Sequence, residues 1–264
     1  MNRGNLLLLR PGSGERSLVF LHPAGGSAGG FRRLLPHLDP TLTVAAFQAG
    51  EPGPDDRCSI PAVAEDYLEE LTETIPVTGA VLAGWSFGGA VAVEMARMAE
   101  QELAPPEAVI LLDSATPVVL GERPRSPSGE LAALFGVDAT AVSGAESWES
   151  ALEAIADALN EASRQVPVSP DELCPFAETY QWHLKASRAP WSGLPCAARV
   201  TLIRAADERG WAGCPDDLGW SAVFGRPIEP QWTPGTHHSL TDPANASALA
   251  DRINSILTGL SACA

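Results

Sequence analysis

Ser86 lies at the centre of a stretch, residues 84–88, that reads GWSFG and fits the pattern G-x-S-x-G. In this pattern the serine stands on a sharp turn between a strand and a helix, and the flanking glycines let the two elements approach each other. A short apolar run at residues 80–83 precedes the stretch, and a strong helix pattern at residues 90–101 follows it. This context predicts a nucleophilic serine at the positive end of a helix, where a developing oxyanion is stabilised.

A serine hydroxyl needs a base to take its proton, and the base needs an acid to orient it. Serine motifs of this kind place the acid next along the chain and the histidine last. His237 and His238 follow the last predicted strand and are the candidate bases. Asp113 ends one predicted strand and Asp207 follows another, so both acids reach the carboxyl edge of the sheet, where active-site groups collect.

A glycine loop, HPAGG at residues 22–26, follows the first buried apolar run. Its backbone can supply one N–H group to an oxyanion, and the N–H of Phe87 can supply the other. A phosphate-binding loop is the alternative interpretation. It is disfavoured because no Lys-Ser/Thr pair follows and no G-x-G-x-x-G pattern is present.

Short apolar runs alternate with helical patterns along most of the chain. This alternation predicts an α/β fold with a mostly parallel central sheet and helices on both faces. The predicted strands are residues 17–21, 42–47, 80–83, 108–112 and 199–203, with a possible edge strand at 228–232. The predicted helices are residues 31–38, a segment beginning at Ser59, residues 90–101 and a closing helix at 244–257.

The pattern changes between residues 116 and 191, where no strand is evident. Helical patterns occur at residues 130–135, 147–159 and 171–186. An insertion of this size between two core strands predicts a helical lid, with additional core helices as the alternative. We therefore expect a single domain spanning residues 1–264 with a lid at about residues 116–191.

Composition excludes several classes of protein. The 264 residues carry a formal net charge of −16, so a nucleic-acid partner is not expected. No apolar run approaches the roughly 20 residues of a membrane helix, and the N-terminus lacks a signal-peptide layout, so a cytoplasmic protein with no membrane partner is expected. The five cysteines include no CxxC pair, so neither disulfides nor a metal site are predicted.

Four segments occur in an order that resembles the thioesterase domains of non-ribosomal peptide and polyketide synthases: residues 22–26 (HPAGG), 84–89 (GWSFGG), 111–114 (LLDS) and 235–237 (GTH). The resemblance implies an α/β-hydrolase fold with a mobile helical lid. It also implies that no cofactor is bound, because a carrier-protein domain delivers the acyl or peptidyl chain on its phosphopantetheine arm. The domain is expected to be monomeric when isolated.

Residue by residue, the resemblance makes Ser86 the acyl acceptor and His237 the base. Asp113 matches the acid of the integrated, chain-terminating type, while Asp207 falls near the acid of many stand-alone editing thioesterases and remains the alternative. Trp85 favours the chain-terminating type. Such domains are usually fused behind a carrier domain, which this sequence lacks, so it is either an excised piece or a free-standing relative.

The same resemblance implies that the backbone amides of Ala24 and Phe87 form the oxyanion hole, and that Trp85 and Gly25 contact the substrate. The expected activity is release of a carrier-bound chain by hydrolysis or by macrocyclisation in natural-product biosynthesis. The alternatives are a stand-alone editing thioesterase, or a carboxylesterase or lipase that acts on small oxyesters. A binding protein with the same fold would lack a triad member, and all three are present.

Overall fold

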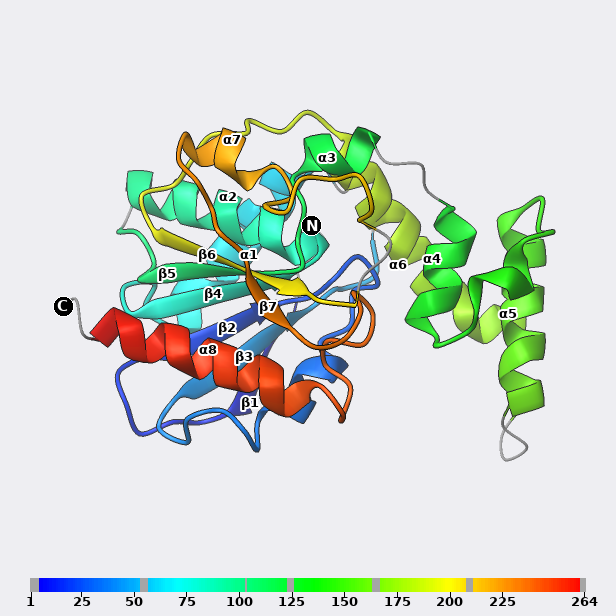
Figure 1. Cartoon of the computed structure of the whole chain (residues 1–264), viewed down its shortest axis with the longest axis horizontal. Coiled ribbons are helices and arrows are strands. Elements are labelled where there is room, and N and C mark those ends of the chain that lie inside the picture. The colour runs from blue at the N-terminus through cyan, green and yellow to red at the C-terminus, as the bar shows by residue number, and fades with distance from the viewer. Residues whose placement is uncertain are drawn as a thin grey trace.

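The computed structural model of the chain describes residues 5–52, 57–102, 104–122, 126–162, 167–207 and 211–261. In this part of the chain seven strands form one sheet in the order β1-β3-β2-β4-β5-β6-β7 (Figure 1). The strands are β1 Asn5–Arg10, β2 Ser17–Leu21, β3 Thr43–Gln48, β4 Ala80–Trp85, β5 Ala108–Leu112, β6 Arg199–Ala205 and β7 Gln231–Thr233.

All strand pairs in this sheet are parallel except β1 with β3. Every residue of β2, β4 and β5 is buried, as expected for strands that are covered on both faces. The predicted mostly parallel sheet is confirmed. β1 is an antiparallel edge strand that the sequence pattern did not predict, and Leu8 on it is 60% exposed.

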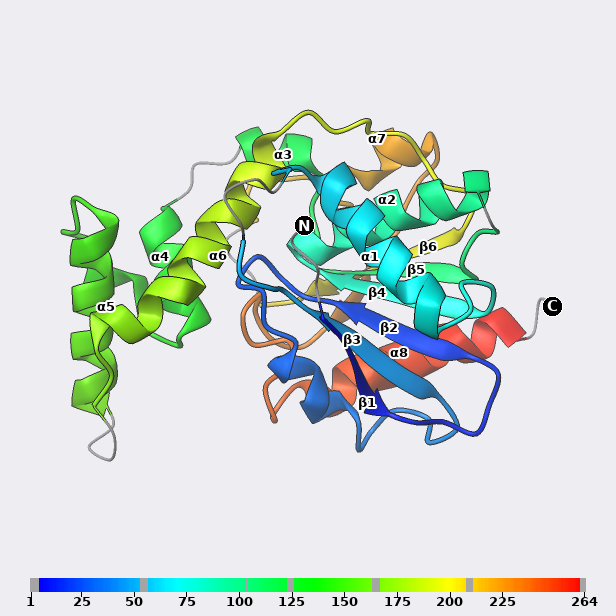
Figure 2. The ribbon, with the colours of Figure 1, turned by 180° about the vertical axis from the view of Figure 1, so that it is seen from behind.

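Helices cover both faces of the sheet. Helices α1 (Ile60–Thr74) and α2 (Phe87–Glu102) pack on one face, and α8 (Ala246–Ser261) with the 3-10 helix η1 (Gly29–Leu34) packs on the other. Figure 1 shows α8 in front of the sheet, and Figure 2, seen from behind, shows α1 and α2 in front of it. The side chain of Ser59 caps α1 by accepting from the N–H of Ala62, as the sequence predicts.

Between β5 and β6 the described residues form helices joined by loops, with no strand. These are α3 (Pro117–Glu122), α4 (Pro127–Leu134), the 3-10 helix η2 (Ala139–Val142), α5 (Trp148–Ala162) and α6 (Pro170–Arg188). Helices α4, α5, α6 and η2 enclose a small hydrophobic cluster of their own, and α4 and α5 lie to one side of the sheet (Figure 1). α6 begins at a capping box between Ser169 and Glu172, which fixes its start near the predicted position.

Three short elements differ from the sequence prediction. The helix predicted at residues 31–38 is the 3-10 helix η1. The edge strand predicted at 228–232 is β7, which is shorter and begins three residues later. The five-residue helix α7 (Trp220–Phe224) has no periodic signal because it is only about one turn long. Within the described residues, no helix combines the length and the apolar character that a membrane span requires.

Candidate active site

Ser86 occupies the turn between β4 and α2 in a left-handed conformation, with φ of 55°. Residues other than glycine rarely adopt this backbone conformation, so the surrounding structure must enforce it at Ser86. The turn is tight enough that a Cβ atom on Gly84 would lie 2.2 Å from the carbonyl oxygen of Gly88. A Cβ atom on Gly88 would lie 2.5 Å from the carbonyl oxygen of Leu21. The two glycines of the motif are therefore required by the close approach of α2 to β4 and β2.

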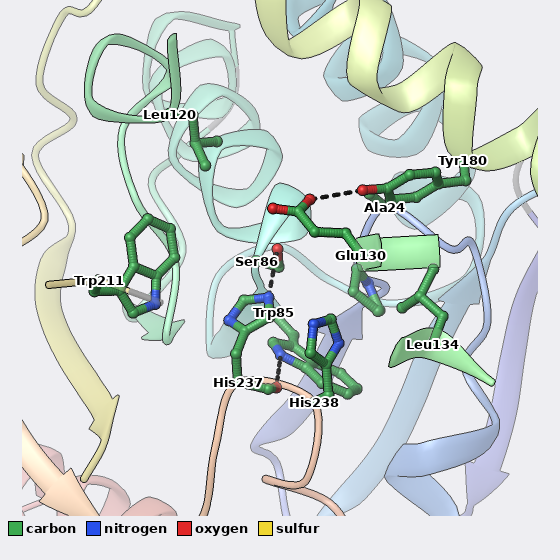
Figure 3. Close-up of a pocket in the computed structure, with 11 residues that line it drawn as sticks. Ala24, Trp85, Ser86, Leu120, Glu130, Leu134, Tyr180, Trp211, His237 and His238 are labelled. Carbon is green, nitrogen blue, oxygen red and sulfur yellow. Dashed lines mark hydrogen bonds between the residues drawn. The ribbon is translucent and has the colours of Figure 1, made fainter. Parts of the chain in front are cut away.

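The structure brings Ser86, His237 and Asp113 together in one hydrogen-bonded relay, although 151 residues separate the serine from the histidine. His237 Nε2 lies 3.0 Å from Ser86 Oγ, a contact drawn in Figure 3. His237 Nδ1 lies 2.8 Å from Asp113 Oδ2. Because a carboxylate accepts, the proton of a neutral His237 is on Nδ1, and Nε2 faces the serine as an acceptor.

Asp113 is fully buried and also has a left-handed φ, of 43°. Its Oδ2 accepts a second hydrogen bond from Trp211 Nε1 at 2.8 Å. Its Oδ1 accepts from Arg204 Nε at 3.0 Å and from the N–H of Ala205 at 3.1 Å. Burial acts to raise the pKa of this carboxyl, but the hydrogen bonds from His237, Trp211 and Ala205 outweigh it and lower the pKa below its usual value. Asp113 is therefore held ionised and in a fixed orientation.

Arg204 and Trp211 were not among the residues predicted for the site. Arg204 is 4% exposed and forms an ion pair with Asp113, and Trp211 also packs edge-on against the His237 ring at 5.9 Å. The available signal for Arg204 was an arginine, next to last in β6, that directly follows the apolar residues Leu202 and Ile203. No signal in the sequence places Trp211, because it reaches the site through a loop.

Asp207, the alternative acid, has a different partner. Its Oδ2 accepts a hydrogen bond from the N–H of Gly235 at 2.9 Å, and its own N–H donates to the carbonyl of Gly235 at 3.0 Å. Gly235 lies two residues before His237. Asp207 thus anchors the loop that carries the histidine, whereas Asp113 contacts the imidazole itself.

The loop after β2 lies beside Ser86, and its histidine is part of the core. His22 is 1% exposed, its Nδ1–H donates to the carbonyl of Pro23, and its Nε2 accepts from the hydroxyl of Tyr67. Burial lowers the pKa of His22 to about 4, against the opposing effect of the hydrogen bond to Pro23. His22 is therefore a neutral residue that holds the shape of the loop.

A second buried histidine connects the helical insertion to the same loop. His183 on α6 is fully buried, and its Nδ1–H donates to the carbonyl of Ala24 at 2.7 Å. Burial and the nearby His22 lower the pKa of His183 to about 3, and the hydrogen bond to Ala24 offsets only part of this effect. Its Nε2 has no hydrogen-bond partner in the part of the chain that the structure describes. No pattern in the sequence marks His183 as part of the site, because its contact with Ala24 joins residues that are 159 positions apart.

A narrow pocket lies over the serine. It is lined by Pro23, Ala24, Trp85, Ser86, Leu120, Glu130, Leu134, Tyr180, Trp211, His237 and His238. Trp85, which the resemblance implies as a substrate contact, lines the pocket, and its Nε1–H donates to the carbonyl of His237 at 3.2 Å. Gly25 lines an adjoining cleft that shares Trp85 and His238 with this pocket.

Three tryptophans in or next to the insertion are not among the residues that line this pocket. Trp148 lies against Tyr180 in the cluster of the insertion, Trp182 packs on the cluster beneath α1 and α2, and Trp191 contacts Trp220. Among the described residues no group of three His, Cys, Asp or Glu side chains has the arrangement of a metal site.

The model of the family described as Thioesterase domain matches residues 16–257, which is most of the chain. The chain belongs to the thioesterase domain family. Orsellinic acid synthase of Beauveria bassiana is 25% identical over 273 residues, covering 90% of this thioesterase domain but 12% of the synthase. Orsellinic acid synthase ArmB of Armillaria ostoyae is 26% identical over 179 residues, covering 68% of the chain and 8% of that protein. The thioesterase domain thus spans a small fraction of the length of these relatives.

Solved structures show the same fold. The four-domain nonribosomal peptide synthetase AB3403 superimposes with a TM-score of 0.78 at 24% identity, covering 95% of this chain and 20% of the synthetase. The NocB thioesterase domain, in covalent complex with a fluorophosphonate nocardicin G analog, superimposes with a TM-score of 0.69 at 23% identity over 97% of this chain and 99% of that one. The thioesterase domain described here therefore has an α/β-hydrolase fold, as the sequence predicted.

Proposed function

We propose that this thioesterase domain releases an acyl or peptidyl chain from the phosphopantetheine thioester of a carrier protein through an ester on Ser86. The observation that carries the proposal is the relay of Ser86, His237 and Asp113, with contacts of 3.0 and 2.8 Å. This is the geometry that a serine needs in order to lose its proton as it attacks a carbonyl carbon. The relatives that are parts of multidomain synthases support delivery by a carrier domain.

The chemistry proceeds in two halves. Ser86 Oγ attacks the thioester carbonyl while His237 Nε2 takes its proton, and His237 then returns that proton to the departing sulfur of the arm. In the second half His237 deprotonates water, or an amine or hydroxyl of the chain itself. That nucleophile attacks the ester, and Ser86 leaves with the proton. Water gives an acid, and an internal nucleophile gives a macrocycle.

The charge that develops on the carbonyl oxygen needs donors at a fixed place. Phe87 is the first residue of α2, so its N–H has no partner within the helix and lies at the positive end of the helix dipole. The N–H of Ala24 is the proposed second donor. The carbonyl of Ala24 accepts from the buried His183, which fixes the orientation of the neighbouring peptide groups.

The test is turnover of an acyl chain loaded on a carrier protein, compared with an N-acetylcysteamine thioester and a nitrophenyl ester of the same chain. Ser86→Ala should lower kcat/KM for every substrate by about 10⁴-fold or more. The control is Ser255→Ala on the exposed face of α8, which should leave turnover unchanged. Substantial residual turnover by Ser86→Ala would overturn the nucleophile. A kcat/KM for the nitrophenyl ester equal to that for the carrier-bound chain would favour a carboxylesterase instead.

A further inference from the structure

A second, larger cleft opens directly beside the pocket over Ser86. The two share the lining residues Pro23, Trp85, Leu134 and His238. The volume of the cleft is about 520 Å³, and that of the pocket is about 60 Å³. Since a single water needs about 10–15 Å³, the pocket has room for the reacting carbonyl and a few further groups only. A longer chain on Ser86 must leave the pocket, and the cleft is continuous with it.

Leu134, the last residue of α4, stands at the boundary between the pocket and the cleft and lines both. Figure 3 shows it on the side of Ser86 opposite Leu120. Leu134 approaches Gly25 so closely that a Cβ atom built on Gly25 would lie 3.1 Å from Leu134 Cδ1. This contact leaves no passage between the two residues. A chain that enters the cleft therefore passes on the other side of Leu134, along Trp85.

Two phenylalanines of the insertion form an apolar wall of the cleft. Phe135 directly follows α4 and Phe176 lies on α6, and their rings pack edge-on with centroids 5.9 Å apart. Phe176 is nevertheless 49% exposed. Sites for organic ligands are concave and lined largely by aromatic and apolar side chains. The exposed ring thus offers a surface that an apolar group in the cleft would cover.

The wall that the core contributes favours an uncharged occupant. Arg33 Nη1 lies 3.0 Å from Asp242 Oδ1, and both residues line the cleft. This ion pair compensates the charge of the guanidinium, so Arg33 attracts a carboxylate or a phosphate only weakly. The same wall also carries neutral hydroxyl groups, those of Ser27, Ser239 and Thr241. The cleft is therefore better suited to an apolar chain than to the phosphate-bearing arm of a carrier protein.

We propose that this cleft binds the distal part of the acyl chain, and that the preferred substrates carry an apolar group, aromatic or aliphatic, that packs against Phe135 and Phe176. The inference rests on the proposed function, since it assumes that the chain is esterified to Ser86. Burial of apolar area stabilises a complex roughly in proportion to that area. A chain that reaches the two phenylalanines gains this contribution, whereas a chain that ends in the pocket does not.

The experiment compares kcat/KM for N-acetylcysteamine thioesters of three chains: butanoyl, octanoyl with a terminal phenyl group, and octanoyl with a terminal carboxylate. Wild type should prefer the phenyl-terminated chain over butanoyl by about 10-fold or more. Phe176→Ala should lower kcat/KM for the phenyl-terminated chain by about 10-fold more than for butanoyl. Leu194→Ala is the control, because Leu194 is 54% exposed and lines neither the pocket nor the cleft. It should leave the preference unchanged.

A second variant tests occupancy of the cleft without removing an apolar contact. Ala133 lines the cleft beside Leu134, so Ala133→Phe places a ring in the space that the chain would occupy. It should also lower kcat/KM for the phenyl-terminated chain more than for butanoyl. Labelling of Ser86 by a fluorophosphonate at the wild-type rate shows that each variant remains folded.

The arm of the carrier protein is the competing occupant. The N-acetylcysteamine thioesters lack most of the arm, so butanoyl-phosphopantetheine is measured beside butanoyl-N-acetylcysteamine. If Phe176→Ala and Ala133→Phe impair the phosphopantetheine thioester and spare all three N-acetylcysteamine thioesters, the cleft holds the arm, and the proposal is wrong.

The remaining outcomes separate this proposal from the proposed function. Equal kcat/KM of wild type for butanoyl and the phenyl-terminated chain would overturn the role of the cleft while leaving the thioesterase function intact. A carboxylate-terminated chain turned over as well as the phenyl-terminated one would overturn the apolar group as the recognised feature. If wild type hydrolyses none of these thioesters and a fluorophosphonate fails to label Ser86, the proposed function falls, and this inference with it.

Discussion

Two buried histidines should make this domain unusually sensitive to mild acid. His22 and His183 have ring centroids 4.9 Å apart beneath the loop at residues 22–26, with pKa values lowered to about 4 and about 3 by burial. In the unfolded chain each imidazole has a pKa of about 6.5. As the pH falls below about 6.5, the unfolded state takes up protons that the folded state does not bind, so the free energy of unfolding decreases.

The size of the effect follows from these values. Between pH 7.5 and pH 5 each histidine should cost the folded state about 2 kcal/mol, because the folded imidazole stays neutral throughout this range. The pair should therefore cost about 4 kcal/mol. Asp113 does not contribute in this window. Its lowered pKa gives stability that is complete above about pH 4 and is lost only as the pH falls through the folded-state value.

The variant that isolates one histidine is His183→Asn. The amide nitrogen of asparagine takes the place of Nδ1, so it can still donate to the carbonyl of Ala24, but it does not titrate. The variant should be less stable at every pH because the smaller side chain leaves space beside Phe87, which contacts the His183 ring. Its loss of unfolding free energy between pH 7.5 and pH 5 should nevertheless be about 2 kcal/mol smaller than that of wild type.

The assay is urea unfolding followed by tryptophan fluorescence at pH 7.5, 6 and 5, with the unfolding free energy extrapolated to water. His37→Asn is the matched control, because it makes the same substitution at an exposed histidine. If wild type and His183→Asn lose the same free energy to within about 0.5 kcal/mol, His183 is not a buried neutral group, and the reasoning fails.

Two further predictions concern the proposed catalytic acid and the glycine turn that carries Ser86. Asp113→Asn should lower kcat by about 10⁴-fold, whereas Asp207→Asn should lower it by less than about 10-fold. Both variants are measured on one thioester, and their melting temperatures are followed in parallel. The opposite order of the two effects would make Asp207 the acid. Gly88→Ala should destabilise the domain by about 2 kcal/mol or more and lower kcat, since its Cβ would lie 2.5 Å from the carbonyl oxygen of Leu21. The control is Gly259→Ala, on the exposed side of α8, where nothing lies within 4 Å of the new Cβ; it should stabilise the domain by about 0.5–1 kcal/mol in the same urea titration. A stability loss for Gly88→Ala no larger than the experimental error would contradict the steric argument.

The features that sequence patterns predicted well are those with strong local signals. The buried runs of β2, β4 and β5 and the glycines around Ser86 specify the sheet and the turn, and the ends of parallel strands then meet at one edge. β1 was missed although its residues 6–9 are a continuous apolar run like those of the predicted strands, because so short a run does not by itself distinguish a strand from other buried structure. The position of the histidine loop was predictable from chain order, but its anchoring by Asp207 was not.

Residues that act through tertiary contacts had no comparable signal. Trp211 reaches Asp113 from a loop, and Glu130 meets Tyr180 across 50 residues of the insertion. A local pattern identifies Glu130 only as a favourable residue near the start of a helix. The direction of the Glu130 side chain depends on how α4 packs against α6. Sequence periodicity therefore does not predict which residues of the insertion line the pocket.

Helix α6 contributes two of the hydrogen bonds through which the insertion meets the site. Tyr180 and His183 are three residues apart and therefore lie on one face of α6, where one orients Glu130 and the other holds the carbonyl of Ala24. Thr179 approaches the same loop so closely that a Cβ atom on Gly26 would lie 2.8 Å from its Cγ2. An outward movement of this part of α6 would leave the buried His183 and the Ala24 carbonyl without their shared hydrogen bond, which is costly. If the insertion opens while α6 keeps its hydrogen bond to the loop at residues 22–26, the movement must occur in α4 and α5 and carry Glu130 away from Tyr180.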